Sequence, residues 1–279
     1  MKLAGTIKKK MTDGIAIGTT VTLADIGVTE GLGLAGLDFV WIDMEHSTLG
    51  KIEVCGHIIA AKASQIASFV RVPWNDPVQM KPILDMGPDG LIVPQIRSLQ
   101  EAKNAIAACF YPPKGVRGFG PLRASGYGTY NITESLPEDY KPTLLFLQVE
   151  HVDCVECIDD ILALEGVDGL IFGPMDLSAS IGKLGKMDDP ELNQIMDDLA
   201  PKIIKSGKIL GVSMAYRPEK VTAWIKRGAT FLSLGQDIEI LLNSVGQMVG
   251  SVESLWQEAS GEQPGSPPKR HRGLTGGAV

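Results

Sequence analysis

The residues Leu144-Leu-Phe-Leu-Gln-Val-Glu150 form a continuous apolar run that ends abruptly in polar side chains. Such a run predicts a strand buried on both faces, as in parallel sheets covered by helices. The pattern recurs at Gly169-Leu-Ile-Phe-Gly173, which is followed by Pro174-Met175-Asp176. Carboxylates just after buried parallel strands lie at the edge where α/β folds carry their chemistry. Glu150 and Asp176 therefore indicate a site for a hard divalent cation with oxygen ligands.

Strand-like runs alternate with segments of helical spacing along the 279-residue chain. We expect eight strands, over residues 15–19, 38–43, 67–72, 89–94, 143–149, 167–173, 208–213 and 230–235. Eight β–α units in roughly 250 residues are the inventory of an α/β protein of the (β/α)8 TIM-barrel class. A doubly wound open sheet is the alternative, but it usually has fewer strands or a second domain, and no linker is recognisable before residue 258.

Three segments lie outside this alternation. Apolar residues at three- and four-residue steps predict an extra C-terminal helix over 237–256, whose stripe suits packing on its own barrel or on another subunit. Residues 258–279 are rich in Gly, Pro and basic residues and predict a disordered tail, so the folded domain is expected to span residues 1–257. The Gly- and Pro-rich stretch 109–142 predicts a helix followed by an extended loop near the barrel mouth.

Composition narrows the class of protein. The net charge of −7 argues against a general nucleic-acid binder, and 44% apolar residues allow a substantial core. No apolar stretch reaches the ~18 residues that a membrane span needs, and the N-terminal lysines are not followed by the apolar core of a secretory signal. Four cysteines do not make a disulfide scaffold in a chain of this length. We therefore expect a soluble protein of the reducing cytoplasm.

Other strand ends add polar candidates at the same rim. Asp43 ends the second expected strand and runs on into Glu45 and His46, and Arg71 ends the third. A histidine can move a proton near neutral pH, and an arginine can donate to an oxygen on which enolate charge develops. Asp43 or Asp85 is the candidate for orienting His46 and raising its basicity.

Enolate chemistry fits these groups. Mg²⁺ or Mn²⁺ held by two carboxylates and water can chelate a 2-oxo acid through its carboxylate and keto oxygens and polarise the carbonyl. Gly173, Pro174 and Met175 lead into Leu177-Ser-Ala-Ser180, which predicts a helix N-terminus. Its free backbone N–H groups would suit a substrate carboxylate.

Over about residues 5–256, the order and spacing of these motifs resemble the HpcH/HpaI aldolases. These enzymes are metal-dependent pyruvate aldolases, typified by 4-hydroxy-2-oxoheptanedioate aldolase. The matching motifs are Asp43-Met-Glu45-His46, Val70-Arg71-Val72-Pro73-Trp74, Val93-Pro94, Tyr111-Pro-Pro-Lys-Gly-Val-Arg117-Gly, Gln148-Val-Glu150 and Gly173-Pro-Met-Asp176-Leu-Ser-Ala-Ser.

The resemblance implies a TIM barrel whose C-terminal helix is exchanged between subunits, typically in a hexamer; a trimer is the other assembly we expect. It implies His46 as proton acceptor and Arg71 as the residue that stabilises the enolate. Asp85 would tune the histidine, across a subunit boundary. Glu150 and Asp176 would hold the divalent metal, Mg²⁺, Mn²⁺ or Co²⁺.

Contacts with the small 2-oxo acid substrate are also implied. Gln148 and the backbone at Met175 would contact pyruvate. Met175 stands where the family usually has Ala, and Ser47 follows the histidine where Ala is common. Both changes bear on the identity of the substrate more than on the reaction.

The resulting hypothesis is a carbon–carbon lyase that cleaves 4-hydroxy-2-oxo acids into pyruvate and an aldehyde. One alternative keeps the enolate but decarboxylates oxaloacetate, or forms a carbon–carbon bond from the enolate so produced. An alternative from another class is a catalytically silent barrel that acts as a binding or assembly protein.

Three other patterns are set aside. Gly31-Leu-Gly33-Leu-Ala-Gly36 matches a dinucleotide fingerprint, but it follows a helix-like stretch and precedes a strand, which is the reverse of what that motif requires. Cys154 and Cys157 lack a second pair of zinc ligands. Lys208, at the start of the seventh expected strand, is at the wrong rim for a Schiff-base mechanism.

Overall fold

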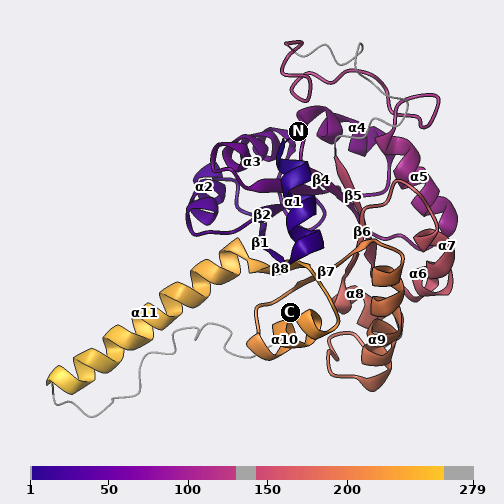
Figure 1. The fold of residues 1–279 in the computed structure, drawn as a ribbon. Coiled ribbons are helices and arrows are strands. Elements are labelled where there is room, and N and C mark those ends of the chain that lie inside the picture. The colour runs from indigo at the N-terminus through magenta and orange to yellow at the C-terminus, as the bar shows by residue number, and fades with distance from the viewer. Residues whose placement is uncertain (1, 130–142, 261–279) are drawn as a thin grey trace.

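The computed structural model describes residues 2–129 and 143–260, and its strands form a closed parallel barrel in the order β1 to β8 (Figure 1). The predicted (β/α)8 architecture is therefore confirmed, with every expected strand present. The strands are β1 (Ala16–Val21), β2 (Phe39–Asp43), β3 (Ala67–Arg71), β4 (Gly90–Val93), β5 (Leu144–Val149), β6 (Gly169–Phe172), β7 (Ile209–Met214) and β8 (Phe231–Gln236).

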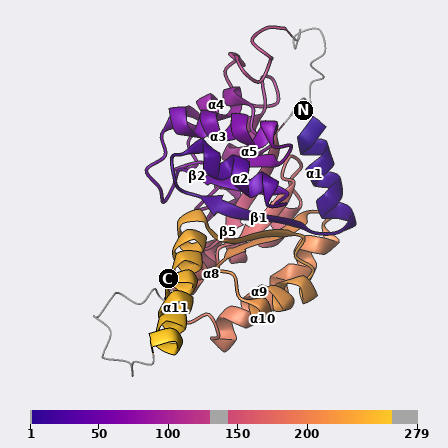
Figure 2. The same ribbon diagram turned by 90° about the vertical axis from the view of Figure 1, so that its left-hand side faces the viewer.

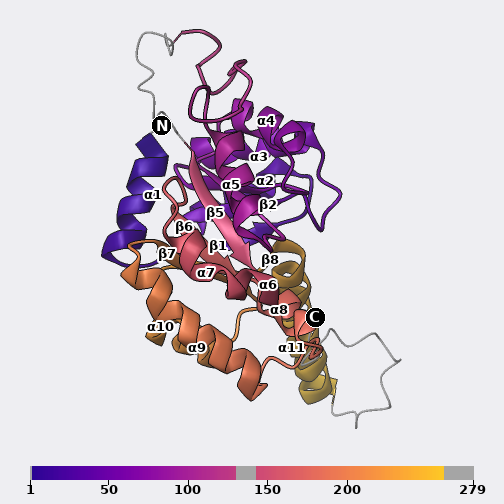
Figure 3. The ribbon, with the colours of Figure 1, turned by 90° about the vertical axis from the view of Figure 1, so that its right-hand side faces the viewer.

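Helices surround the barrel, as Figure 1 and the two side views in Figures 2 and 3 show. They bury the outward-facing side chains of the strands, which explains why the strands read as continuous apolar runs. The helices are α1 (Lys2–Asp13), α2 (Ile26–Leu34), α3 (Lys51–Ala63), α4 (Pro77–Met86), α5 (Leu99–Cys109), α6 (Val152–Glu156), α7 (Ile158–Leu162), α8 (Pro174–Ser180), α9 (Pro190–Lys205), α10 (Pro218–Lys226) and α11 (Asp237–Ser260).

Phenylalanine rings fill the barrel interior, and each ring lies against a glycine on a neighbouring strand. A Cβ added to Gly90 would lie 2.0 Å from the ring of Phe69, so a larger residue there would overpack the layer. The core below the rim is therefore a packed layer rather than a channel. The register pairs are Gly18 with Phe39, Phe69 with Gly90, Phe146 with Gly169, and Gly211 with Phe231.

The N-terminal end of the barrel is closed by a repeated polar arrangement. Asp38, Asp89 and Asp168 precede β2, β4 and β6, and each carboxylate accepts a hydrogen bond from a backbone N–H of the preceding strand. Helix α1 lies across this end through ion pairs of Lys10 with Asp38 and of Lys8 with Asp168. The strand ends are therefore accessible at the C-terminal rim of the barrel.

Helix α11 confirms the predicted C-terminal helix and continues to Ser260, so the first three residues of the predicted tail are helical. The remainder of the predicted tail lies outside the described residues. α11 projects away from the barrel (Figures 1 and 2), and Leu242, Met248 and Leu255 on it are exposed. Despite this apolar stripe, no helix in the described ranges has the length and apolar content to cross a membrane.

The described part of the segment after α5, residues 110–129, lies at the N-terminal end of the barrel, so the predicted place near the mouth is wrong for these residues. It follows a helix rather than a strand, and Arg123 donates to the backbone oxygen of Met86 at the end of α4 (2.6 Å). Arg117 pairs with Asp85 at the same end of α4 (2.9 Å). Residues 130–142, the rest of this segment, lie outside the described residues.

Candidate active site

Arg71 is the central cation at the C-terminal rim. The β2–β3 register places it beside Asp43, and its Nε and Nη2 donate to the two oxygens of that carboxylate at 2.8 and 2.6 Å. The guanidinium also lies 5.2 Å from the centre of the Trp41 ring. A forked contact to a carboxylate that is 2% exposed fixes the orientation of the arginine.

Glu45 is a site residue to which the sequence had assigned no role. Its side chain is 10% exposed, and its Oε2 lies 2.9 Å from Nη1 of Arg71. Burial raises the pKa of Glu45 to about 7, with the nearby Asp43 and Asp176 carboxylates adding to the rise and Arg71 opposing it. The signal available was its place two residues beyond a strand end, directly before His46.

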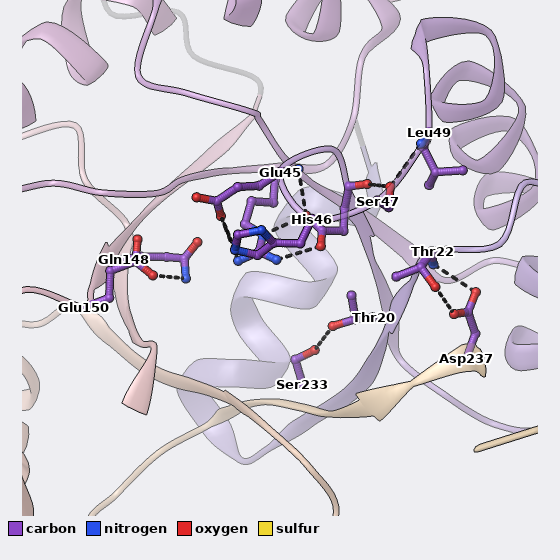
Figure 4. A network of polar contacts seen from close by, with 12 residues as sticks. Thr20, Thr22, Glu45, His46, Ser47, Leu49, Gln148, Glu150, Ser233 and Asp237 are labelled. Carbon is purple, nitrogen blue, oxygen red and sulfur yellow. Dashed lines mark hydrogen bonds and ion pairs between the residues drawn. The ribbon is translucent and has the colours of Figure 1, made fainter. Parts of the chain in front are cut away.

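Glu150 is held at both carboxylate oxygens. Oε1 accepts the backbone N–H of Gln95 at 2.5 Å, and Oε2 accepts from Nε2 of Gln148 at 2.9 Å (Figure 4). Gln95, which the sequence did not single out, adopts a left-handed backbone with φ of 55°. Burial raises the pKa of Glu150 to about 7, and the Glu45 and Asp176 carboxylates add to this, although the Gln95 N–H and Arg71 oppose it.

The turn into α8 brings the remaining candidates to the same rim. Pro174 is buried, while Met175 and Asp176 are half-buried. The charge of Asp176 raises the pKa of both Glu45 and Glu150, which places the three carboxylates within electrostatic reach of one another. A Cβ at Gly173 would lie 2.9 Å from Oε2 of Glu150, so a larger residue at this position would displace the Glu150 carboxylate.

His46 is the accessible group of the site. Its side chain is 63% exposed, and its Nε2 lies 3.8 Å from Oε2 of Glu45 (Figure 4). The Asp43 carboxylate is engaged by Arg71, and Asp85 is at the opposite end of its own barrel. The structure thus brings His46 together with Glu45, and any role of Asp85 toward a histidine requires a second subunit.

The donor set suits a hard divalent cation. Glu45, Glu150 and Asp176 carry more negative charge than the Arg71 guanidinium beside them offsets, and carboxylate oxygens are the ligands that Mg²⁺ and Mn²⁺ prefer. Within residues 2–129 and 143–260, no group of three or more His, Cys, Asp or Glu side chains is placed so that all of them could hold one metal ion. The set therefore fits an ion bound by few carboxylates, with coordination positions left for water and substrate.

A parallel barrel that gathers an arginine, an accessible histidine and buried carboxylates at its C-terminal rim has the layout of a TIM-barrel enzyme. The sequence model of the HpcH/HpaI aldolase/citrate lyase family matches residues 17–244, and the chain belongs to this family. The predicted family and the predicted lyase class are thereby confirmed. The roles assigned to individual residues stay predictions.

Relatives with similar sequences and structures cover nearly the whole barrel. The chain is 35% identical to the hydroxypyruvate/pyruvate aldolase of Roseobacter denitrificans, over 86% of this chain and 93% of that protein. It is 33% identical to the 5-keto-4-deoxy-D-glucarate aldolase of Enterobacter sp., over 85% and 92%. Its fold matches the crystal structure of an HpcH/HpaI aldolase from Desulfitobacterium hafniense with a TM-score of 0.83, at 29% identity, covering 94% and 99% of the two chains.

Proposed function

We propose that this chain is a divalent-metal-dependent aldolase that cleaves 4-hydroxy-2-oxo acids to pyruvate and an aldehyde, and catalyses the reverse addition. The observation that carries the proposal is the meeting of Glu150 and Asp176 with Arg71, Gln148 and His46 at one rim. The names of the two sequence relatives, both aldolases, support the same reaction class.

Glu150 and Asp176 would hold the cation, Mg²⁺, Mn²⁺ or Co²⁺. When bound, the ion supplies Lewis-acid polarisation of the keto group. The clustering of buried carboxylates supports this assignment, because burial, together with the charges of Glu45 and Asp176, raises the pKa of Glu150 to about 7.

The chain's own groups would position the keto acid and stabilise its charge. Oε1 of Gln148 is buried without a hydrogen-bond partner among the described residues, so the amide has capacity left for a ligand. The glycine at 173 and the backbone of Met175 allow close approach beside it. Arg71, fixed in advance by Asp43, would stabilise negative charge as the enolate forms.

His46 would accept the proton of the 4-hydroxyl group as the bond between C3 and C4 breaks, and would return it in the addition direction. Its exposure allows exchange of that proton with solvent. Within one chain, Asp85 pairs with Arg117 at the end of the barrel opposite His46, so it could reach a histidine only in a neighbouring subunit. There it would orient His46.

The decisive test is metal removal. Protein treated with a chelator should lose at least about 100-fold of its pyruvate-release rate on a panel of 4-hydroxy-2-oxo acids, and Mg²⁺, Mn²⁺ or Co²⁺ should restore it. Pyruvate is measured by a coupled dehydrogenase, and the aldehyde in parallel. Full activity of metal-free protein would contradict the mechanism. Turnover of oxaloacetate to pyruvate without any aldehyde-forming reaction would favour the decarboxylase alternative.

We further propose that α11 packs on another copy of the chain, in a trimer or hexamer. A stripe containing Leu242, Met248 and Leu255 is exposed on a helix that projects from the barrel, which is costly for an isolated molecule. Light scattering should show an oligomer for the wild type and a smaller species for Met248→Glu/Leu255→Glu. Gln247→Glu, which adds charge at a polar position of the same helix, is the control. A monomeric wild type would exclude the assembly.

A further inference from the structure

Three residues other than glycine have a left-handed backbone in the described ranges. They are Gln65, Gln95 and Tyr127, with φ of 60°, 55° and 58°. A Cβ makes this conformation unfavourable, and where it persists the surrounding structure holds it, often at a functional site. Of the three, Gln95 lies at the C-terminal rim, directly after β4, so the constraint that holds it there is to be sought in the candidate active site.

The turn at Gln95 determines where its backbone N–H points. Strand β4 ends two residues earlier, and Pro94 has no N–H, so Gln95 carries the first backbone donor beyond the strand. That N–H donates to Oε1 of Glu150 at 2.5 Å. The next residue, Ile96, is fully buried in the core between the strands and the helices. The left-handed turn lets the N–H face the rim while the chain leaves it at once.

The side chain of Gln95 ties this turn to the start of α5. Its Oε1 accepts from Nη2 of Arg97 at 3.1 Å, and the backbone N–H of Arg97 donates to Oε2 of Glu101 at 2.6 Å. Glu101 also belongs to the capping box that begins α5 at Ser98. A glycine would adopt the same φ without strain, but it would also be free to leave it. The turn at Gln95 is therefore strained and held in place.

Glu150 is in turn held from several sides. Besides the Gln95 N–H on Oε1, its Oε2 accepts from Nε2 of Gln148 at 2.9 Å, and its side chain lies against the backbone of Gly173. The residue is 2% exposed, so water does not replace these contacts freely. Groups that orient a metal-binding carboxylate typically change metal affinity when they are altered, although they do not touch the ion.

We propose that Gln95 is a positioning residue for the metal site: its left-handed backbone holds the Glu150 carboxylate in the orientation that receives the divalent cation. The inference rests on the proposed metal-dependent function and adds a residue to it. What position 95 must supply is a backbone conformation rather than a particular side chain. Residues that adopt the left-handed region readily should therefore replace Gln95, and residues that avoid it should not.

The test measures the dissociation constant for Mn²⁺ on chelator-treated full-length protein by the effect of bound Mn²⁺ on water relaxation. Gln95→Val should raise this constant by about 10-fold, because a β-branched side chain strongly disfavours positive φ. Gln95→Ala should raise it by about 3-fold, and it keeps the test open if the Val variant does not fold. Gln95→Asn should stay within about 2-fold of the wild type, since Asn enters the left-handed region more readily than other residues with a side chain.

Gln65→Val is the matched control. Gln65 has the same side chain and nearly the same φ, but it lies in the turn between α3 and β3, beside α1 at the N-terminal end of the barrel. This variant should lower the unfolding temperature about as much as Gln95→Val does, without changing the dissociation constant for Mn²⁺. An equal loss of Mn²⁺ affinity in Gln65→Val would show that general destabilisation is responsible and would overturn the inference.

The remaining outcomes separate this inference from the proposed function. A wild type that binds no Mn²⁺ would overturn the proposed function itself. A wild type that binds Mn²⁺, with Gln95→Ala and Gln95→Val both unchanged, would overturn the positioning role alone. A loss in Gln95→Asn as large as that in Gln95→Val would assign the effect to the side-chain contact with Arg97, and would overturn the role given to the backbone.

Discussion

Replacing Glu150 with Gln should raise the dissociation constant for Mn²⁺ by about 100-fold or more and lower pyruvate release in proportion at limiting metal. The amide has nearly the shape of the carboxylate but lacks its charge, and only one of its terminal atoms can accept a hydrogen bond. The Gln95 N–H or the Gln148 amide would therefore lose its acceptor. Titration with Mn²⁺, followed by its paramagnetic effect on water relaxation, measures the affinity directly.

Glu150→Gln should also make the metal-free protein more stable than the metal-free wild type at high pH. The pKa of Glu150 is raised from the ordinary 4.5 to about 7, so the folded state holds this proton more tightly than the unfolded chain does. The stability of the metal-free wild type should therefore fall as the pH rises from about 4.5 to about 7, by up to about 3 kcal/mol for this group. Below that window the penalty is absent, because the carboxyl is protonated in both states.

Thermal unfolding in chelator at pH 5 and pH 8 tests this. Wild type should lose stability between the two values, Glu150→Gln should lose less, and Mn²⁺ at pH 8 should restore the wild type only. Glu165→Gln removes a charge from an exposed residue and is the control. A wild type that is equally stable at both pH values in chelator would show that the pKa of Glu150 is not raised in the folded protein.

The strands could be predicted because burial on both faces leaves a direct trace in the sequence. Residues 143–149 were expected as a strand, and β5 covers Leu144–Val149. Polar residues that interrupt an apolar run at its end mark the rim, since the interior there gives way to solvent. The placement of Arg71, Gln148 and Glu150 at one rim follows from the parallel topology alone.

Which rim residues touch one another could not be predicted in the same way. Asp43 was considered as the partner of His46, but the β2–β3 register sets it beside Arg71. Glu45 lies in a loop, where no periodicity signals direction, and its contact with Arg71 appears only in three dimensions. The position of Asp85 depends on where α4 ends. The role that the family resemblance implies for it also requires a second subunit, and the spacing of residues along one chain carries no information about that subunit.

Replacing His46 with Ala should lower the cleavage rate by about 10²- to 10⁴-fold, the usual contribution of a positioned general base, while leaving the affinity for Mn²⁺ unchanged. His46 is 63% exposed and its nearest ionic partner, Glu45, is 3.8 Å away, so removing the ring should cost little stability. The lost rate can then be assigned to proton transfer rather than to collapse of the site. This separates His46 from Glu150, whose replacement should act through the metal.

Kinetics with added imidazole provide the positive readout. The exposure of position 46 leaves space for a small base in the Ala variant, so imidazole should restore part of the rate, increasingly as the pH rises and more of it is neutral. Thr48→Ala, at an exposed position two residues away, should behave as the wild type. A His46→Ala enzyme with undiminished activity would transfer the proton-accepting role to another group, and Glu45 is then the nearest candidate, because its pKa of about 7 would let it exchange a proton near neutral pH.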